Sequence, residues 1–357
     1  MKKVITVLLA ALALLSGASC TLDEEPVGQG HITMTLSTAD VETKAGNGDV
    51  ADGGGIVVNG NLDPDLVIAI VDKNNNIVAW YPKGSHVGSY QSSCISASET
   101  ESTIGFTGGL TKGTYTVFAV ANTAGLSAMG NPALSSQTTL SGLQDLYLTA
   151  IPTFSDNVPM PLSATGTLVV TGESGYESGQ VDLSLKRVVA RVSLTFRNLT
   201  EEELVLNNCS VTLYKMNPSR GYLFAPATND YYSGNDGNLA FNAASVTVPV
   251  LNPENPESVN TYCLDPELVF PSIAPQQPTG RRYLCDIRFT LAGEAQPRSF
   301  TGLPVHDRRS ADILALGRNQ DLKIETTISK KGEDNHDITF NFIVSGWDKK
   351  EEFVWFH

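Results

Sequence analysis

The alternation of apolar with polar residues is the feature that most limits what this chain can fold into. Residues 31–37 read His-Ile-Thr-Met-Thr-Leu-Ser, and in an extended strand this order places Ile32, Met34 and Leu36 on one face. No long stretch carries apolar residues at the spacing of three and four that an amphipathic helix requires. Thr, Ser, Val, Gly and Asn are abundant, and together with the alternation they predict an all-β protein.

Further strands can be placed in the first half of the chain. A continuous apolar run at 66–71 predicts a strand buried on both faces, and the turn at 72–76 leads into a second strand at 77–81, so the two form a hairpin. Residues 113–122 are apolar on both faces, which is typical of a central strand. Residues 123–145 are small and polar, and they hold the only short helix that we expect in this half.

The longest strand candidate spans residues 181–196, but its apolar residues do not keep to one face. They change face near Lys186, so we expect a bulge or a bend at that point. Two basic residues follow the change, and their positions in the alternation predict that both stand on the solvent face of the strand. These residues are Arg187 and Arg191.

A polar run at 198–203 interrupts the strand pattern, and a new series of strands follows it. We place a domain boundary there and predict two antiparallel β-sandwiches in tandem, at 45–200 and 201–357. The candidate strands of the second half lie at 209–216, 245–251, 268–270, 283–291, 321–328 and 337–344.

The N-terminus resembles a bacterial lipoprotein leader. Lys2 and Lys3 form a basic end, an apolar run follows at 4–15, and small residues precede Cys20. The run is shorter than the ~20 residues that span a bilayer, so we expect residues 1–19 to be removed and acyl chains on Cys20 to serve as the anchor. The acidic residues after Cys20 are similar to the surface-export signal of Bacteroides-type lipoproteins. The alternative is an ordinary secretory leader followed by a chance cysteine.

The charge of the chain argues against nucleic acid as a partner. The formal net charge is −14, and removal of the leader with its two lysines changes it to about −16. Proteins that bind nucleic acid neutralise phosphates with an excess of Lys and Arg, and this chain has the opposite excess.

The residue types that usually carry catalysis do not form a recognisable site. The five histidines are scattered, none is paired with another at metal-ligand spacing, and the sequence holds no Gly-x-Ser-x-Gly elbow, P-loop or dinucleotide fingerprint. We interpret the polar cluster at 306–309 as an exposed loop, and Asp337 beside His336 as a turn before the last long strand. The sequence predicts no enzyme activity, no metal site and no cofactor.

Four cysteines follow Cys20, and an exported chain can oxidise them. They form no Cys-x-x-Cys pair, which argues against zinc. Cys263 and Cys285 flank a proline-rich segment and are the pair that we expect if a disulfide forms. The alternative is a set of separate buried thiols, Cys94, Cys209, Cys263 and Cys285.

Six motifs, in order along nearly the whole chain, resemble those of the fimbrillin family, the lipoprotein-derived subunits of type V pili. Two of them are similar to a family processing site and to a Gly-x-Tyr-x-Val strand that ends in Ala-Asn. The others are similar to a Pro-Met turn, a strand that closes the first domain, an Arg-Asn motif that leads into a late strand, and a terminal tryptophan motif. They are Thr43-Lys44-Ala45, Gly113–Asn122, Pro159-Met160, Arg187–Arg191, Gly317-Arg318-Asn319 and Gly346-Trp347.

The resemblance implies a fold of two transthyretin-like β-sandwiches and a mechanism of assembly. In such pili the lipidated precursor reaches the outer membrane, and a trypsin-like protease cuts after Arg or Lys. Here the cut would fall after Lys44 and leave Ala45 first. The released segment, 20–44, carries the first strand with Ile32, Met34 and Leu36. The vacated groove then accepts a C-terminal strand from another fimbrial subunit, which is donor-strand exchange.

The C-terminal end allows two interpretations. Residues 348–357 include an apolar run that is either a short donor strand or the last strand of the second sandwich. The run consists of Phe353, Val354, Trp355 and Phe356. Lys44 in a polar segment favours a cleaved shaft or tip subunit of a surface fimbrium over an anchor.

A rival hypothesis is a surface lipoprotein that stays anchored, either as a fimbrial anchor or as an adhesin for glycans or host proteins. Four aromatic residues are candidates for stacking against sugars, although aromatic side chains are more often buried. They are Trp80, Tyr81, Tyr231 and Tyr232. A receptor on a host or bacterial surface would be a partner in either case.

Overall fold

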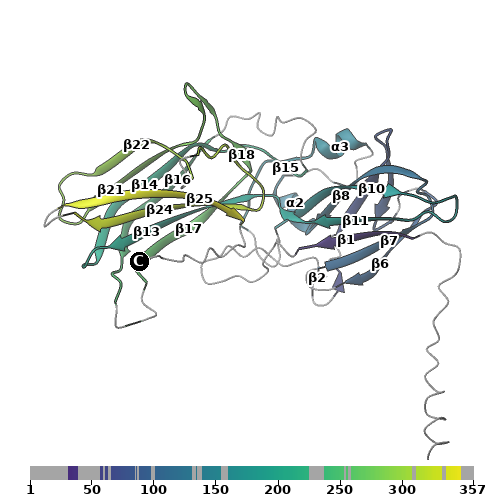
Figure 1. Ribbon diagram of the computed structural model, residues 1–357, viewed down its shortest axis with the longest axis horizontal. Helices are drawn as coiled ribbons and strands as arrows, with labels where there is room; N and C mark the ends of the chain where they lie inside the picture. The colour runs from purple at the N-terminus through teal and green to yellow at the C-terminus, as the bar shows by residue number, and fades with distance from the viewer. Residues whose placement is uncertain are drawn as a thin grey trace, which may run out of the picture.

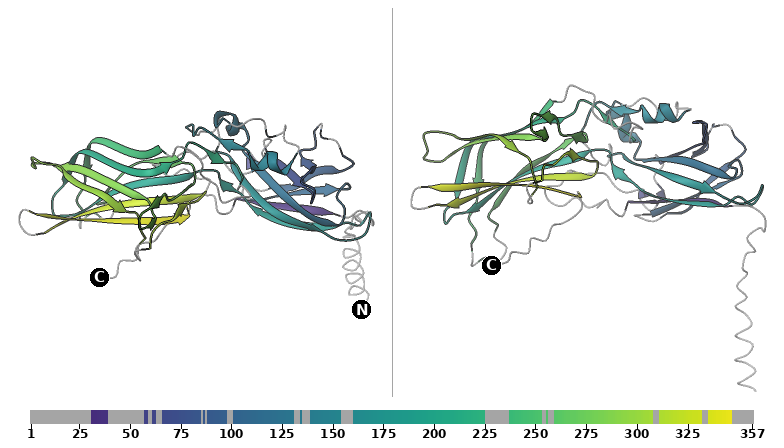
Figure 2. Two further views of the ribbon diagram at one scale, coloured as in Figure 1. Left: turned by 90° about the horizontal axis from the view of Figure 1, so that it is seen from above. Right: turned by 45° about the horizontal axis from the view of Figure 1, so that its top comes forward.

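The computed structural model describes residues 31–38, 57–58, 61–62, 66–84, 86, 88–97, 101–130, 134, 139–153, 160–224, 237–252, 255, 259–307, 311–331 and 335–346. Almost all of the regular structure in these residues is β-strand, as the alternation predicted. Two pairs of sheets lie end to end along the long axis of the molecule (Figure 1, Figure 2). Within the described part of the chain, no helix is both long enough and apolar enough to cross a membrane.

The N-terminal sheet pair consists of a four-stranded and a five-stranded sheet. The first has the order β11-β1-β7-β6, built from β1 Ile32–Ser37, β6 Gln91–Ala97, β7 Glu101–Thr107 and β11 Gly179–Ser184. The second has the order β12-β10-β8-β4-β5, built from β4 Val67–Val71, β5 Ile77–Tyr81, β8 Gly113–Ala121, β10 Leu162–Val170 and β12 Lys186–Arg187. One apolar cluster joins the facing sides of both sheets.

Two predictions for this region are confirmed. β4 and β5 form the expected antiparallel hairpin across the 72–76 turn, where the Asp72 carboxylate accepts from the backbone amides of Asn74 and Asn76 at 2.8 and 2.9 Å. β8 is a central strand, with β4 on one side and β10 on the other, which explains why both of its faces are apolar.

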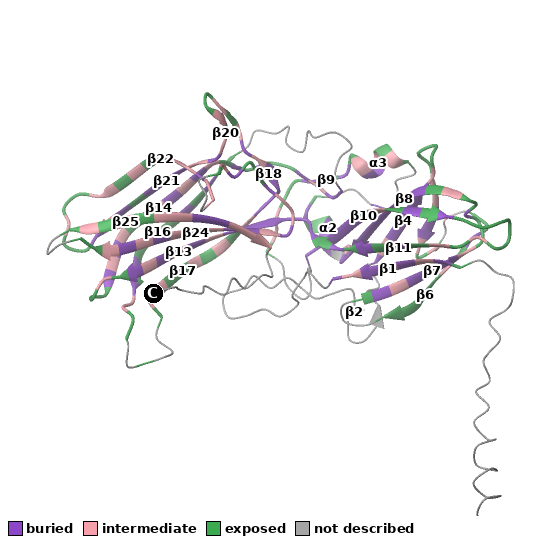
Figure 3. Cartoon of the chain, in the orientation of Figure 1, coloured by how far each residue is buried: buried purple, intermediate pink, exposed green. Residues whose placement is uncertain are grey.

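The C-terminal sheet pair has two four-stranded sheets. One has the order β17-β13-β24-β25, built from β13 Ala190–Leu199, β17 Thr261–Val269, β24 Gln320–Lys330 and β25 His336–Gly346. The other has the order β16-β14-β21-β22, built from β14 Leu204–Asn217, β16 Gly237–Val248, β21 Leu284–Leu291 and β22 Arg298–Pro304. A second apolar cluster fills the space between them, and buried positions alternate with half-buried or exposed ones along several strands (Figure 3).

Two short helices and several two-residue strands accompany the four sheets. The segment that was predicted to hold the only short helix of the first half holds two, α2 Ala124–Ala128 and α3 Leu140–Gln144, so the predicted number is wrong. Four pairs of two-residue strands complete the described structure. They are β2 Val57–Val58 with β3 Asn61–Leu62, β9 Tyr147–Leu148 with β15 Gly221–Tyr222, β18 Ser272–Ile273 with β23 Ala315–Leu316, and β19 Gln276–Gln277 with β20 Gly280–Arg281.

A third apolar cluster lies where the two sheet pairs meet and combines residues from distant parts of the sequence. Phe118 of β8 meets Phe224 edge to face, with ring centroids 4.8 Å apart. Phe270, which follows β17, belongs to the same cluster, as does Leu143 of α3. The outer face of the five-stranded sheet is therefore covered by its own helices and by residues that follow β15 and β17.

The prediction of one long strand at 181–196 is wrong. The chain forms three strands there, in three different sheets: β11, β12 and β13. The change of face near Lys186 marks the passage of the chain from one sheet to the next, not a bulge within one strand. β13 pairs in parallel with β24 and antiparallel with β17, so residues 190–199 belong to the C-terminal sheet pair.

The expectation that Arg187 and Arg191 face solvent is also wrong, since their exposed fractions are only 1% and 8%. Each guanidinium has a buried polar partner instead. Arg187 Nη1 donates to Asn319 Oδ1 at 2.8 Å, and Arg191 Nη2 pairs with Asp321 Oδ2 at 2.9 Å. A buried charge is tolerated when it is paired and hydrogen-bonded, and strand alternation in the sequence does not reveal such partners.

Candidate functional site

β1 is a central strand of its sheet, although it is the first described element of the chain. It pairs in parallel with β11 and antiparallel with β7 over all six of its residues. Met34, at the middle of the strand, stands opposite Val181 of β11 and Ile104 of β7. A strand in this position contributes main-chain hydrogen bonds to two neighbours and is not an edge.

The inward face of β1 is completely buried. Ile32, Met34 and Leu36 have exposed fractions of 2%, 0% and 0%, and all three belong to the apolar cluster between the two N-terminal sheets. The predicted alternation of this strand is therefore confirmed. Burial of such side chains contributes about 1.5–3 kcal/mol each before the cost of ordering the chain.

Backbone hydrogen bonds join the two ends of β1 to β11 and to Leu185, the residue that follows β11. The backbone amide of Gly179 donates to His31 O at 3.4 Å, and the amide of Leu185 donates to Ser37 O at 2.9 Å. The sequence alone does not reveal these partners. Val181 and Leu183 alternate with polar residues as the apolar residues of β1 do, and this alternation is the only sequence signal for the pairing of β1 with β11. Alternation does not specify which strands pair.

The other predicted site residues of this assembly lie outside the described residues. The structure therefore places neither the lipidation site, nor the processing site, nor the apolar C-terminal run. These are Cys20, Lys44, Ala45, Phe353, Val354, Trp355 and Phe356.

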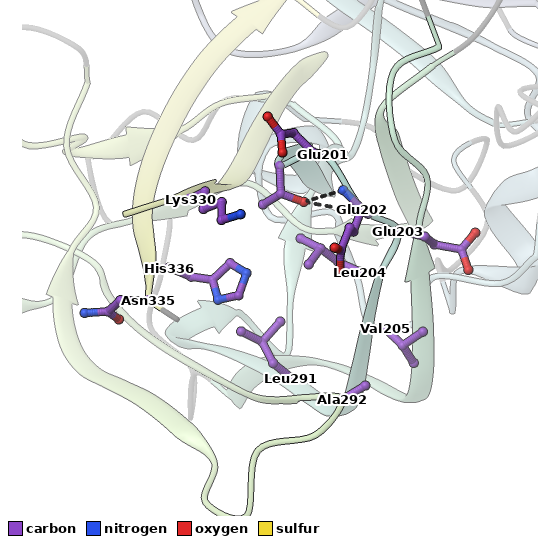
Figure 4. A pocket seen from close by; sticks show the side chains of 11 residues that line it. Glu201, Glu202, Glu203, Leu204, Val205, Leu291, Ala292, Lys330, Asn335 and His336 are labelled. Atoms are coloured by element: carbon purple, nitrogen blue, oxygen red, sulfur yellow. Dashed lines mark hydrogen bonds between the residues drawn. The ribbon is translucent and has the colours of Figure 1, made fainter. Parts of the chain in front are cut away.

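A cavity of about 210 Å³ lies among the ends of β13, β14, β21, β24 and β25 (Figure 4). The charge run that was predicted as a domain boundary forms one wall, and His336 and Lys330 lie on the opposite side. His336 is the first residue of β25, where a turn had been expected to precede the strand, and its carbonyl accepts from Arg298 Nη1 at 3.1 Å. Nothing in this geometry aligns a nucleophile with a base.

The histidines do not assemble a metal centre in the described residues. No group of three His, Cys, Asp or Glu side chains within them has the geometry to hold a metal ion. His306 Nδ1 lies 3.0 Å from Asp307 O, and the Asp307 carboxylate accepts from the amide of Ala311 at 2.9 Å. These contacts give His306 and Asp307 a local structural role, and the other two residues of the polar cluster, Arg308 and Arg309, lie outside the described residues.

The pairing considered for Cys263 and Cys285 is not formed, and the four described cysteines are free. Cys263 lies exposed on the edge strand β17, whereas Cys285 of β21 is buried inside the apolar cluster of the C-terminal sheets. Burial raises the pKa of the Cys285 thiol to about 12 and that of Cys209 to about 11. These two residues are buried thiols, as the alternative interpretation held, but that interpretation is wrong for Cys94 and Cys263, which are exposed.

Trp80 is not available as a sugar platform, contrary to the rival hypothesis. Its side chain is 5% exposed, its ring stacks on His86 with centroids 4.5 Å apart, and its backbone amide donates to Tyr90 Oη at 2.9 Å. Tyr81 is half-buried, and Tyr231 and Tyr232 lie outside the described residues.

A comparison with known protein families finds a match over most of the chain. The model of the family described as "Fimbrillin-A associated anchor proteins Mfa1 and Mfa2" matches residues 90–353, which is well over half of the chain. The chain belongs to this family of fimbrial anchor proteins. The fimbrial resemblance expected from the motifs is thus confirmed, and the family indicates a location in a cell-surface fimbrium.

Solved structures of fimbrial proteins are similar to this member of the fimbrial anchor family at low sequence identity. A fimbrilin from Porphyromonas gingivalis is 10% identical, with a TM-score of 0.49 and coverage of 90% of this chain and 98% of that one. The fimbrial anchor protein Mfa2 from the same organism is 12% identical, with a TM-score of 0.35 and coverage of 89% and 98%. A fimbrial assembly protein from Parabacteroides distasonis is 12% identical, with a TM-score of 0.42 and coverage of 89% and 98%. No curated protein sequence matches the chain.

Proposed function

We propose that this protein is a structural subunit of a cell-surface fimbrium that is made as a lipidated precursor, cut after Lys44 and polymerised by donor-strand exchange. The observation that carries the proposal is the place of β1, a strand between β7 and β11 whose inward face is completely buried. The segment with Lys44 separates it from the rest of the chain. Membership of a fimbrial family supports the location and the kind of partner.

The energetics of the strand explain why cutting and assembly would be coupled. Loss of β1 leaves β7 and β11 without their shared neighbour and opens the apolar surface that Ile32, Met34 and Leu36 cover. A domain is typically stable by only ~5–15 kcal/mol, so an open groove with unpaired strand edges is prone to aggregate. Addition of a strand from a second subunit restores both the hydrogen bonds and the apolar contacts. The C-terminal run at 353–356 is the proposed donor.

Delivery of the precursor to the cell surface depends on its N-terminal residues. The leader 1–19 directs export, and acylation of Cys20 holds the precursor at the outer membrane until the cut. A trypsin-like protease and other fimbrial subunits are the partners. Two domains divide the chain, and the pairing of β13 with β24 favours a boundary just before Ala190 over the one after Thr200. The protein acts through assembly and adhesion, not catalysis.

Digestion of the folded precursor with a trypsin-like protease tests the proposal. We expect a new N-terminus at Ala45, followed by multimers on a native gel. A Lys44→Gln variant is expected to keep β1 and stay monomeric, whereas a Lys73→Gln variant in the β4–β5 turn is expected to behave as the unmodified chain does. Resistance at Lys44 together with a lack of multimers contradicts the cleaved-subunit proposal.

A second candidate function is a fimbrial anchor that keeps both β1 and its lipid. The family description, which names anchor proteins, and the complete pairing of β1 favour it. The first residue of the protein recovered from the cell surface separates the two candidates. A mature chain that begins at acylated Cys20 supports the anchor, and one that begins at Ala45 supports the cleaved subunit.

A further inference from the structure

One arginine of the C-terminal sheet pair reaches into the N-terminal pair. Arg318 lies in the turn before β24, and its Nη2 donates to Ser163 O at 2.6 Å and to Ser163 Oγ at 2.7 Å. The Ser163 hydroxyl donates in turn to Leu223 O at 2.6 Å, and Arg318 Nη1 donates to the same carbonyl at 3.1 Å. A single guanidinium therefore joins β10, the residues after β15 and the turn before β24.

The same turn holds the short strand β12. Arg318 Nη2 donates to Lys186 O at 3.2 Å, and its Nε donates to Arg187 O at 3.5 Å. The buried Arg187 side chain contacts Asn319 Oδ1 at 2.8 Å, and the backbone amide of Asn319 donates to Val189 O at 3.0 Å. Residues 318 and 319 thus donate hydrogen bonds to the main-chain carbonyls of both residues of β12, Lys186 and Arg187, and of Val189, which follows shortly after.

β12 directly follows β11, which has little support within its own sheet. β11 is an edge strand, and among the described strands β1 is its one pairing partner. The backbone amide of Leu185, between β11 and β12, donates to Ser37 O at the end of β1 at 2.9 Å. When β1 is absent, β11 keeps its packing on β10, the bridge between Thr171 and Ser178 just before its first residue, and its continuity with β12.

We propose that Arg318 is a positioning residue that holds β11 in place through β12, so that the C-terminal sheet pair maintains one wall of the β1 site. A fork of guanidinium donors suits this role because it engages several fixed carbonyls at once. The inference concerns the uncut chain and does not depend on cleavage at Lys44. If the proposed function is right, β7 and β11 keep their spacing after β1 is removed. A strand from a second subunit then binds in a preformed groove.

Hydrogen–deuterium exchange of the uncut protein, resolved by peptide, tests this inference. In an Arg318→Met variant we expect the backbone amides of 179–187 to exchange about tenfold faster, as the loss of several charged hydrogen bonds implies. The amides of β21, at 284–291, are expected to keep their rates, because they lie in the other sheet pair and do not contact Arg318. Arg318→Lys keeps one charged donor and is expected to give a smaller acceleration of 179–187.

Arg298→Met is a matched control. Arg298 also donates to a main-chain carbonyl, that of His336, and its side chain is 20% exposed, but it lies among the ends of the C-terminal strands. We expect no change at 179–187 in this variant. Unchanged exchange at 179–187 in Arg318→Met, or an equal acceleration at 284–291, overturns the inference, since the latter denotes a general loss of stability.

Ser163→Ala provides a second, milder variant that removes one acceptor of Arg318 and leaves the arginine in place. Should Arg318→Met fail to fold, exchange in Ser163→Ala decides the matter. A severalfold acceleration confined to 179–187 supports the inference, and unchanged rates in both Ser163→Ala and Arg318→Lys contradict it. Either result is independent of whether the protein assembles into a fimbrium.

Discussion

Arg191 Nη2 and Asp321 Oδ2 lie 2.9 Å apart, with exposed side-chain fractions of 10% and 0%. Their strands, β13 and β24, run in parallel, and the two residues are direct partners in the register. Ser193 Oγ donates to the second carboxylate oxygen at 2.9 Å. A residue near the middle of the chain and one close to its end thus form a buried ion pair. Asp321 lies two residues after Asn319, next to the turn that carries Arg318.

Removal of one partner of this pair is expected to destabilise the protein strongly. Arg191→Met leaves the Asp321 carboxylate buried without its cation, and breaking a buried pair typically costs about 3–5 kcal/mol. The free energy of unfolding, measured with urea, checks this. Arg282→Met is the control, because Arg282 and Asp312 form a more exposed pair at 3.1 Å, for which we expect a loss below about 1 kcal/mol. Equal losses in the two variants contradict the prediction.

The inward face of β1 is expected to carry most of its contribution to stability. Met34→Ala removes a completely buried side chain, and such truncations cost about 2–5 kcal/mol. Thr35→Ala, one residue along on the half-buried outer face, is expected to cost less than about 1 kcal/mol. Urea unfolding of the uncut chain measures both variants. If Thr35→Ala is as harmful as Met34→Ala, the strand does not occupy the apolar cluster as described.

Gly221 is expected to be sensitive to any side chain. A Cβ at this position would overlap the ring of Phe270, which belongs to the apolar cluster between the sheet pairs. Gly221→Ala therefore forces the ring to move, and overpacking of this kind costs about 1–3 kcal/mol. At Gly113, the nearest atom to an added Cβ is 3.7 Å away, so Gly113→Ala serves as the control. Thermal unfolding of both variants gives the comparison.

The four described cysteines are expected to react at two very different rates. Burial raises the pKa of the Cys285 thiol to about 12, so at pH 8 only about one molecule in ten thousand carries the thiolate there. Iodoacetamide is expected to modify the exposed Cys94 and Cys263 in the native protein, and to reach Cys209 and Cys285 only in urea. Peptide mapping by mass spectrometry identifies the sites. Protection of Cys94 and Cys263 as an oxidised pair would contradict the free thiols described here.

Glu294 and Arg298 are expected to give a small contribution to stability that depends on pH. The hydrogen bonds from Arg298 are the main cause that lowers the pKa of Glu294 below its ordinary value. A carboxyl with a lowered pKa stabilises the folded state above the unfolded pKa of about 4.3, and this stabilisation is lost as the pH falls through the folded value. Urea unfolding at pH 6 and pH 3 is expected to show a smaller difference for Glu294→Gln than for the unmodified chain. A larger difference reverses the sign and refutes the assignment.

The sequence predicted individual strands better than their partners. The alternation at 31–37 identified the buried face of β1, and the apolar run at 113–122 identified β8 as a central strand, because period-two patterning records which face of a strand is buried. The same patterning gave a wrong prediction for 181–196, where three strands that follow directly along the chain belong to three different sheets. Strand pairing depends on contacts between residues far apart in the chain, such as Arg191 with Asp321, and local alternation carries no record of them.

The sequence by itself determined the all-β class of this protein, the buried face of its first strand and, through six separated motifs, its fimbrial family. The export leader stays a prediction. Only the tertiary structure decided that β1 lies between β7 and β11, that Arg187 and Arg191 are buried, and that the turn at Arg318 joins the two sheet pairs. The physical reason is that burial of an apolar face leaves a local pattern, whereas a polar side chain reveals its role only when the fold brings its distant partner within hydrogen-bonding distance.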